Sequence, residues 1–177
     1  PGLILANAGD SLPEFLQKVG KPLAELTFAP DEDGIIPVLD GEWFEDDIVA
    51  RTRDFLRATF GEATLRENLR FLEDSLGKDL RKYFLNDFYK DHLQTYKKRP
   101  IYWLVSSGKQ RAFQCLVYLH RYHEGTLARM RTEYVIPLQG QIAARIEQLE
   151  GDKAKATSTS HRKKLQKEQD DLKKQQA

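Results

Sequence analysis

The chain has 177 residues, of which 40% are hydrophobic and 31% charged, a balance that suits a soluble globular protein with one sizeable core and excludes a fibrous class. Its apolar runs are far shorter than the roughly 20 residues of a membrane-spanning helix, no signal peptide opens it, and its single cysteine excludes an intramolecular disulfide, as expected in a reducing cytoplasm. The net charge of +1 hides an asymmetry, because residues 1–50 hold two Lys and eleven acids whereas residues 51–177 hold 26 Lys or Arg and 16 acids.

The first 40 residues predict little regular structure. We expect residues 1–30 to be a linker or loosely packed segment with one short helix over Ser11–Val19. Asp33-Gly34 predicts a turn. Pro37 limits the apolar run that follows to an edge strand or an extended connector, because proline cannot donate to a central ladder.

Apolar residues at helical spacing predict a helix over Phe44–Phe60, and Gly61 follows where a left-handed cap would end it. Thr64-Leu65-Arg66-Glu67 has the form of a capping box, in which the hydroxyl and the carboxylate each accept a hydrogen bond from an orphan backbone N–H. It predicts a second helix that ends at Gly77. A stripe of leucines on this helix is interpreted as core: Leu65, Leu69, Leu72 and Leu76.

A third helical region is predicted from Lys78 to about Lys98, with a break near Asn86 and an end before Pro100. The runs Ile101–Val105 and Ala112–Leu119 are rich in β-branched and aromatic residues and flank a polar turn, which predicts a β-hairpin. The second run is also long enough for a helix, so both interpretations stay open.

The remaining chain predicts two helices that fold back on each other. Thr126 can cap a long helix with a kink at Pro137, and residues 151–160 are interpreted as a polar connector to a last helix that begins at about Ser160. Apolar residues at coiled-coil spacing predict an αα-hairpin whose distal part is missing. These residues are Ile142, Ile146 and Leu149 on the first helix and Leu165 and Leu172 on the second.

The expected fold class is therefore mainly α with a small β-hairpin (α+β), in which a helical body precedes a long αα-hairpin or coiled-coil arm. We expect residues 31–123 to form the body, with the β-hairpin at about residues 100–120, and residues 124–177 to form the arm. Because no initiator methionine opens the chain and the helical pattern still runs at its end, both ends are expected to be cut from a longer protein.

The sequence lacks the motifs of a self-contained enzyme. Cys115, His120 and His123 do not have the spacing of zinc ligands. No G-x-S-x-G elbow or Cys-His signature indicates a nucleophile, and Gly108-Lys109 lacks the rest of a phosphate-binding loop. We therefore predict no catalytic, cofactor-binding or metal-binding residue in this chain.

Cations and aromatic residues are interleaved around the predicted hairpin. The cations can contact phosphates, and Arg can bind guanine edges. Alternatively, the aromatic residues form the hairpin core and the cations an ordinary solvated surface. The candidate DNA-binding residues are Lys97, Lys98, Arg99, Lys109, Arg111, Arg121, Arg129 and Arg131.

Several runs of residues resemble, in order, the C-terminal region of the PglX-type adenine-specific DNA methyltransferases of BREX phage-defence systems. These runs are Asp33–Val38, Asn86–His92, Lys98–Lys109, Ala112–Tyr122 and Thr126–Val135. Together they span about residues 30–150. One departure is Val105, where an aromatic residue is expected.

The resemblance implies a bacterial, cytoplasmic parent protein that transfers a methyl group from S-adenosylmethionine to adenine in double-stranded DNA. The family's Asn-Pro-Pro-Tyr motif and its glycine-bearing cofactor motif are missing from this chain, so catalysis and cofactor are expected elsewhere in the parent. This chain is then expected to be a non-catalytic DNA-binding or target-recognition fragment. The alternative is a protein-interaction module whose coiled coil docks a partner subunit, another BREX component or a phage inhibitor, and a free-standing enzyme is the least favoured hypothesis.

Overall fold

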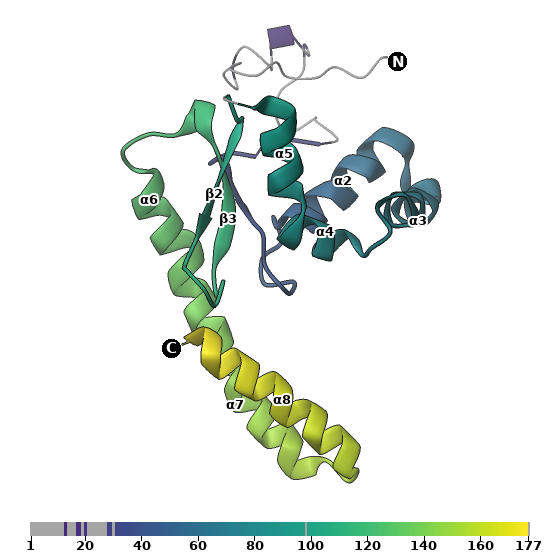
Figure 1. The fold of residues 1–177 in the computed structure, drawn as a ribbon, viewed down its shortest axis with the longest axis vertical. Helices are drawn as coiled ribbons and strands as arrows, with labels where there is room; N and C mark the ends of the chain where they lie inside the picture. The colour runs from purple at the N-terminus through teal and green to yellow at the C-terminus, as the bar shows by residue number, and fades with distance from the viewer. Residues whose placement is uncertain are drawn as a thin grey trace. The chain divides into compact units, whose positions relative to one another are not determined.

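The computed structural model describes residues 31–97 and 99–176 and, before them, Pro13, Gln17, Lys18, Gly20, Phe28 and Ala29. The linker expected over residues 1–30, with its short helix, therefore lies almost entirely outside the described residues, as does Lys98. The structure is mainly helical with one small antiparallel sheet (Figure 1), which confirms the expected fold class. It divides into two compact units, Pro1–Val105 with Cys115–Tyr122 and Ser106–Gln114 with His123–Ala177.

A three-stranded sheet lies mostly in the first unit. Its strands β1 (Ile35–Pro37), β2 (Tyr102–Ser106) and β3 (Gln114–Tyr118) have the order β1-β3-β2. The hairpin is confirmed, and the second apolar run is a strand. β1 pairs antiparallel with β3 and is an edge strand, the position in which Pro37 lacks no ladder hydrogen bond.

The central strand β3 forms the core of this sheet. Cys115, Leu116 and Val117 are buried, together with Ile35 on the neighbouring β1. An unbroken apolar run is typical of a strand that is covered on both faces. This burial explains why the run does not alternate between apolar and polar residues, and the strand excludes the helix that its length had left open.

Helix α2 (Ile48–Phe60) begins later than expected, because Asp47 caps it by accepting from the N–H groups of Val49 and Ala50. It ends at Gly61, whose φ of 86° is positive but whose ψ of 160° is extended, so the expected left-handed cap is wrong in its ψ angle. A 3₁₀ turn, η2 (Glu62–Thr64), leads from there into the next helix.

The expected capping box at Thr64 is wrong. The 3₁₀ turn runs directly into α3 (Leu65–Leu76), so Thr64 already has helical backbone angles and its hydroxyl donates back to the carbonyl of Phe60, 2.9 Å away. The left-handed end at Gly77 is confirmed, with φ 64° and ψ 20°. No residue of α3 is fully buried, so its leucine stripe is a half-buried face and not part of the core.

The third helical region is two helices, α4 (Leu80–Asn86) and α5 (Phe88–Tyr96), which confirms the break near Asn86. Figure 1 shows α5 beside the strands of the first unit, with α2, α3 and α4 together on its other side. Within the first unit, α5 is therefore the helix that lies next to the hairpin strands.

The second unit contains one long helical path and a return helix. The path consists of α6 (Thr126–Arg129), the π-helical segment η4 (Met130–Val135) and α7 (Ile136–Lys155). Where we expected a kink at Pro137, the π-helical segment directly precedes the proline and places it in the first turn of α7. A π turn commonly absorbs an interruption of the α-helical ladder, and proline in a first turn loses no intrahelical bond.

Helix α8 (Thr159–Gln176) packs antiparallel against α7, as the sequence predicted (Figure 1). The connector is shorter than expected, because α7 continues to Lys155 and only residues 156–158 separate the helices. Buried seam residues include Leu149, Leu165, Leu172 and Gln169. No helix in the described part of the chain is long and apolar enough to cross a membrane.

Candidate nucleic-acid interface

The turn of the hairpin is an ordered loop that presents two of the candidate cations. The Ser107 N–H donates to the Phe113 carbonyl at 2.9 Å, and the Phe113 N–H donates to the Ser107 hydroxyl at 3.0 Å, so the loop is closed from both sides. Within it, the Arg111 N–H donates to the Gly108 carbonyl at 3.1 Å. The side chains of Lys109, Gln110 and Arg111 are exposed.

Two candidate cations have unusual backbone angles. Among the residues that the structure describes, Lys97 (φ 52°) and Arg111 (φ 49°) are the non-glycine residues with positive φ. Such a conformation costs a side-chain-bearing residue on the order of 1 kcal/mol and persists where the surrounding bonds impose it. At Arg111 the closed loop imposes it, and at Lys97 the end of α5 does, where the Lys97 N–H donates to the Leu93 carbonyl.

Three of the candidates, Lys97, Arg99 and Arg121, lie in the first unit at the open end of the hairpin. This end is closed by a bond from the Leu119 N–H to the Ile101 carbonyl at 2.9 Å. Arg121 is half-buried, donates to the carbonyl of Asp31 and lies over the Tyr118 ring. Its guanidinium therefore holds the β1 turn, whereas Lys97 and Arg99 are exposed.

The other described candidates lie in the second unit. Lys109 and Arg111 belong to the hairpin loop, and Arg131 is exposed in η4. Arg129 pairs with Glu133 at 2.8 Å one helical turn away. The structure thus divides the predicted site into one set at the open end of the hairpin and one set at its turn and on the following helix.

Some aromatic residues around the hairpin pack in its core, and others are exposed on its surface. The rings of Tyr102 and Tyr118 pack 5.4 Å apart, as the interpretation of a hairpin core requires. Trp103 on β2 is 58% exposed, and Tyr122 is exposed after β3. Exposed aromatic rings beside cations can stack on bases or sugars.

His92 is a structural acceptor. It is 6% exposed, and its Nε2 accepts from the N–H groups of Ile101 and Tyr102 at 3.1 Å each, which ties α5 to β2. Aromatic rings surround it, the nearest being Tyr96 at 4.7 Å. Burial lowers the pKa of His92 below its ordinary 6.5, because a buried imidazolium lacks water and this one would also lose both acceptor bonds.

The lowered pKa of His92 predicts acid sensitivity. The folded state disfavours the imidazolium, so the stabilisation by neutral His92 is complete above pH 6.5 and is lost as the pH falls through the lowered pKa. We expect the imidazole signal of His92 in an NMR titration to change below pH 6.5, and the free energy of unfolding to fall over the same range. A His92 signal that changes at or above pH 6.5 would contradict this prediction.

The β1 turn contains an acidic pair that the sequence analysis did not single out. Asp31 accepts from the Gly34 N–H at 2.6 Å and Asp33 from the Ile35 N–H at 2.8 Å. Burial, together with the nearby charge of Asp33, raises the pKa of Asp31 to about 7. The Asp-x-Asp-Gly pattern was the available signal, since both carboxylates must fold over the same turn.

Asp31→Asn is expected to stabilise the chain at alkaline pH. Because the folded-state pKa lies above 3.8, the stabilisation from protonated Asp31 is complete below pH 4 and is lost as the pH rises through about 7. The variant should therefore match the original chain at pH 4 and exceed its unfolding free energy by about 1–2 kcal/mol at pH 8, after allowance for partial exposure. Glu32→Gln, at an exposed acid in the same turn, serves as the control for the loss of one carboxylate.

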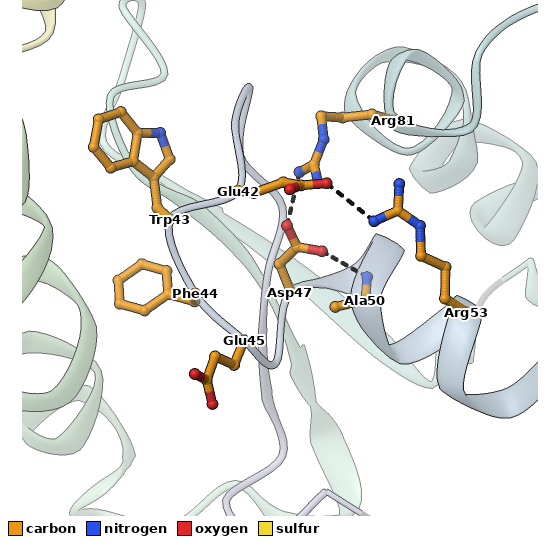
Figure 2. Close-up of a pocket in the computed structure, with 8 residues that line it drawn as sticks. All are labelled: Glu42, Trp43, Phe44, Glu45, Asp47, Ala50, Arg53 and Arg81. Carbon is orange, nitrogen blue, oxygen red and sulfur yellow. Dashed lines mark hydrogen bonds and ion pairs between the residues drawn. The ribbon is translucent and has the colours of Figure 1, made fainter.

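A buried ion pair stabilises the first unit beside a pocket of about 270 Å³. Figure 2 shows Asp47 and Arg81 facing each other there, 2.8 Å apart, and a second pair between Arg53 and Glu42. Arg81 also donates to the carbonyls of Leu39 and Gly41. Asp47 and Arg81 thus join α2, α4 and the loop before α2, which makes their role structural.

The described residues contain no group of three His, Cys, Asp or Glu side chains arranged to hold a metal ion. Burial raises the pKa of the Cys115 thiol to about 12, which keeps it protonated and a poor nucleophile. Cys115 and His92 are therefore both buried residues of the core.

Two curated proteins match most of the chain. "Adenine-specific methyltransferase BrxX" of Escherichia coli O9:H4 (strain HS) is 45% identical over 97% of the chain. "Adenine-specific methyltransferase PglX" of Lacticaseibacillus casei (strain Zhang) is 41% identical over 80% of it. The chain spans only 15% and 13% of the lengths of these relatives. No family model matches the chain.

Proposed function

We propose that this chain, which is homologous over most of its length to a segment of adenine-specific methyltransferases, is a non-catalytic DNA-binding and target-recognition part of such an enzyme. The homology confirms the resemblance predicted from the sequence. The whole enzyme would transfer a methyl group from S-adenosylmethionine to adenine in double-stranded DNA, in a system of phage defence in the bacterial cytoplasm.

The single observation that carries this proposal is 45% identity to a protein named for a reaction on adenine. An enzyme that modifies one base within a duplex needs surfaces that hold the backbone and select the site. The chain offers cations for the first task and an arginine in an ordered loop for the second, since Arg can bind the O6 and N7 of guanine with two hydrogen bonds.

The hairpin loop is the best-built candidate for base contact. Lys109, Gln110 and Arg111 stand side by side on a loop whose ends are joined by two hydrogen bonds. A closed loop loses little conformational entropy when it binds, so its side chains keep more of their interaction free energy. At the open end of the hairpin, the exposed Lys97 and Arg99 are the cations that we assign to phosphate contact.

Methyl transfer and cofactor binding are assigned to other parts of the enzyme. The Asn-Pro-Pro-Tyr motif and a glycine-bearing cofactor motif are missing from this sequence, and the chain spans about one seventh of its relatives. Incubating the chain with DNA and labelled S-adenosylmethionine should give no incorporation. Methylation by this chain alone would show that the assignment is wrong.

The alternative, a protein-interaction module that docks a partner through its coiled coil, has less support. The seam residues that would dock a partner helix, Leu149, Leu165 and Leu172, are already buried in the α7–α8 pair. A different surface favours a partner: Phe60 and Phe71 on α2 and α3 are exposed. Replacing both with serine should leave DNA binding unchanged and remove any partner that docks there.

Titration of a labelled duplex with the chain at several salt concentrations tests DNA binding. Neutralisation of phosphates releases counterions, so log K should fall linearly with log salt with a slope of roughly −0.9 for each phosphate contacted. Absence of binding at low salt, or binding that does not respond to salt, would rule out the proposed contact.

A further inference from the structure

The far end of the α7–α8 hairpin is the most strongly basic stretch of the chain. Residues 153–167, which form the end of α7, the connector and the first half of α8, hold six Lys or Arg and no Asp or Glu. The acids of this hairpin flank this stretch in the sequence, at Glu147, Glu150 and Asp152 before it and at Glu168, Asp170 and Asp171 after it. Charge is therefore segregated along the sequence of the hairpin, whereas a helix face that serves solubility alone usually mixes both signs.

The cations near the acids are paired, and those at the far end are not paired with acids. Arg145 pairs with Glu168 at 2.7 Å and Lys174 with Asp171 at 3.2 Å. At the far end, Lys153 binds the neutral amides of Gln166 and Gln169. The exposed far-end lysines are Lys155, Lys163, Lys164 and Lys167.

Hydroxyl and backbone donors lie among these lysines. Thr157, Ser158, Thr159 and Ser160 are exposed in the connector and at the start of α8. The first N–H groups of the 18-residue helix α8 point toward the same end, where the helix dipole favours an anion. Ammonium groups, hydroxyls and free helix N–H groups are the donors that bind phosphate oxygens of nucleic acids.

We propose that this far end, named here the basic tip (Lys155, Lys163, Lys164 and Lys167 with the connector hydroxyls), is a second DNA-binding surface that contacts the phosphate backbone of a duplex. The inference rests on the proposed function and adds to it a contact surface separate from the hairpin loop. The tip selects no base, because lysine and hydroxyl contacts to phosphates are independent of sequence.

A duplex fits this surface better than an anionic membrane does. Membrane-bound helices insert apolar side chains between lipids, but the apolar residues of α8, Leu165 and Leu172, are buried against α7. The exposed side chains of the tip are lysines and small hydroxyls, which bind phosphates from the outside. Such a surface gives strong dependence on salt and little dependence on sequence.

Two lysine pairs on the same helix provide a matched test. Lys163→Gln with Lys164→Gln removes two charges from the tip, and Lys173→Gln with Lys174→Gln removes two from the acid-rich end of α8. Binding of the full chain to a labelled duplex is measured over a salt series, and circular dichroism checks that α8 remains helical. We expect the tip variant to lower the salt slope by roughly 1.8 and the affinity at physiological salt about tenfold, with little change in the control variant.

The outcomes separate this inference from the proposed function. Equal losses of affinity in both variants would show an effect of net charge alone. An unchanged affinity in the tip variant would exclude the tip as a contact. Either result overturns the inference. If the tip variant stays at full affinity while a hairpin-loop variant loses binding, the proposed function stands and the tip fails. Loss in the tip variant without loss in the loop variant supports the tip and counts against the loop. Binding to phosphatidylserine vesicles that is tighter than binding to the duplex would also overturn the choice of DNA.

Discussion

Replacing Lys109 and Arg111 with glutamine is expected to lower the affinity of the chain for its preferred duplex by roughly tenfold to a hundredfold. Lys109 would lose a phosphate contact, which is independent of sequence. Arg111 would lose a bidentate contact to a base, which is worth about 1–3 kcal/mol and discriminates between sequences. The double variant should therefore bind more weakly and also distinguish less between target and random duplexes, as measured by competition binding.

The matched control removes one lysine and one arginine from elsewhere in the chain. Lys90 and Arg66 are exposed on α5 and α3 and lie outside the candidate set, so Lys90→Gln with Arg66→Gln causes the same change in net charge. If the control variant loses as much affinity as the loop variant, binding reflects total charge and the hairpin loop has no special role. If the loop variant loses affinity equally for all duplexes, Arg111 contacts a phosphate and not a base.

Asp47→Ala is expected to have the largest effect on stability of the changes considered, on the order of 3–5 kcal/mol. Asp47 is 1% exposed, caps α2 through two hydrogen bonds of 2.8 Å and neutralises Arg81. Its removal leaves the Arg81 guanidinium with only the exposed carboxylate of Glu42, 3.9 Å away, and leaves two helix N–H groups without an acceptor. Urea unfolding should show the loss as a lower midpoint.

Companion variants separate the two roles of Asp47. Asp47→Asn keeps an oxygen for the helix N–H groups, so it should lose less than Asp47→Ala by about 1 kcal/mol. Arg81→Met in the Asp47→Asn background removes the uncompensated charge. The double variant should therefore lose less unfolding free energy than the sum of the losses in the two single variants. Glu45→Ala, at an exposed acid in the same loop, is the control and should change stability little. Fully additive losses would mean that the ion pair does not couple the two residues.

Elements with strong local patterns could be predicted from the sequence. The hairpin followed from two β-branched and aromatic runs around a polar turn, and the edge position of β1 followed from the missing N–H of Pro37. The end of α3 followed from Gly77, and the α7–α8 pair from leucines one heptad apart. In each case the deciding feature lies within a few residues of the element that it specifies.

Features that depend on a neighbouring element were missed. Thr64 and Glu67 match a capping box in sequence, but the 3₁₀ turn before them already supplies helical geometry, which no local motif announces. Gln169 occupies a buried seam position because the Ile146 carbonyl and Glu150 on α7 satisfy its amide. The pairing of Asp47 with Arg81 joins residues 34 positions apart, a separation at which sequence spacing carries no information.

The candidate site could be predicted as a list of residue types and not as a surface. The sequence collected eight cations around the hairpin, and those that the structure describes differ in exposure. Arg121 holds the β1 turn and Arg129 pairs with Glu133, while Lys109 and Arg111 are exposed on the loop. The lysines of the basic tip went unnoticed because they lie far along the chain from the hairpin.

The π-helical segment η4 determines on which side of α7, relative to α6, the helix α8 packs. A π turn accommodates about one more residue than an α turn, and one residue corresponds to about 100° of rotation around a helix with 3.6 residues per turn. The face of α7 that receives α8 is therefore rotated by roughly a quarter turn relative to α6, compared with an uninterrupted α-helix. Loss of a single residue between Met130 and Val135 would swing α8, and the lysines it carries, to another side of the α6–α7 axis without altering any contact inside the α7–α8 pair.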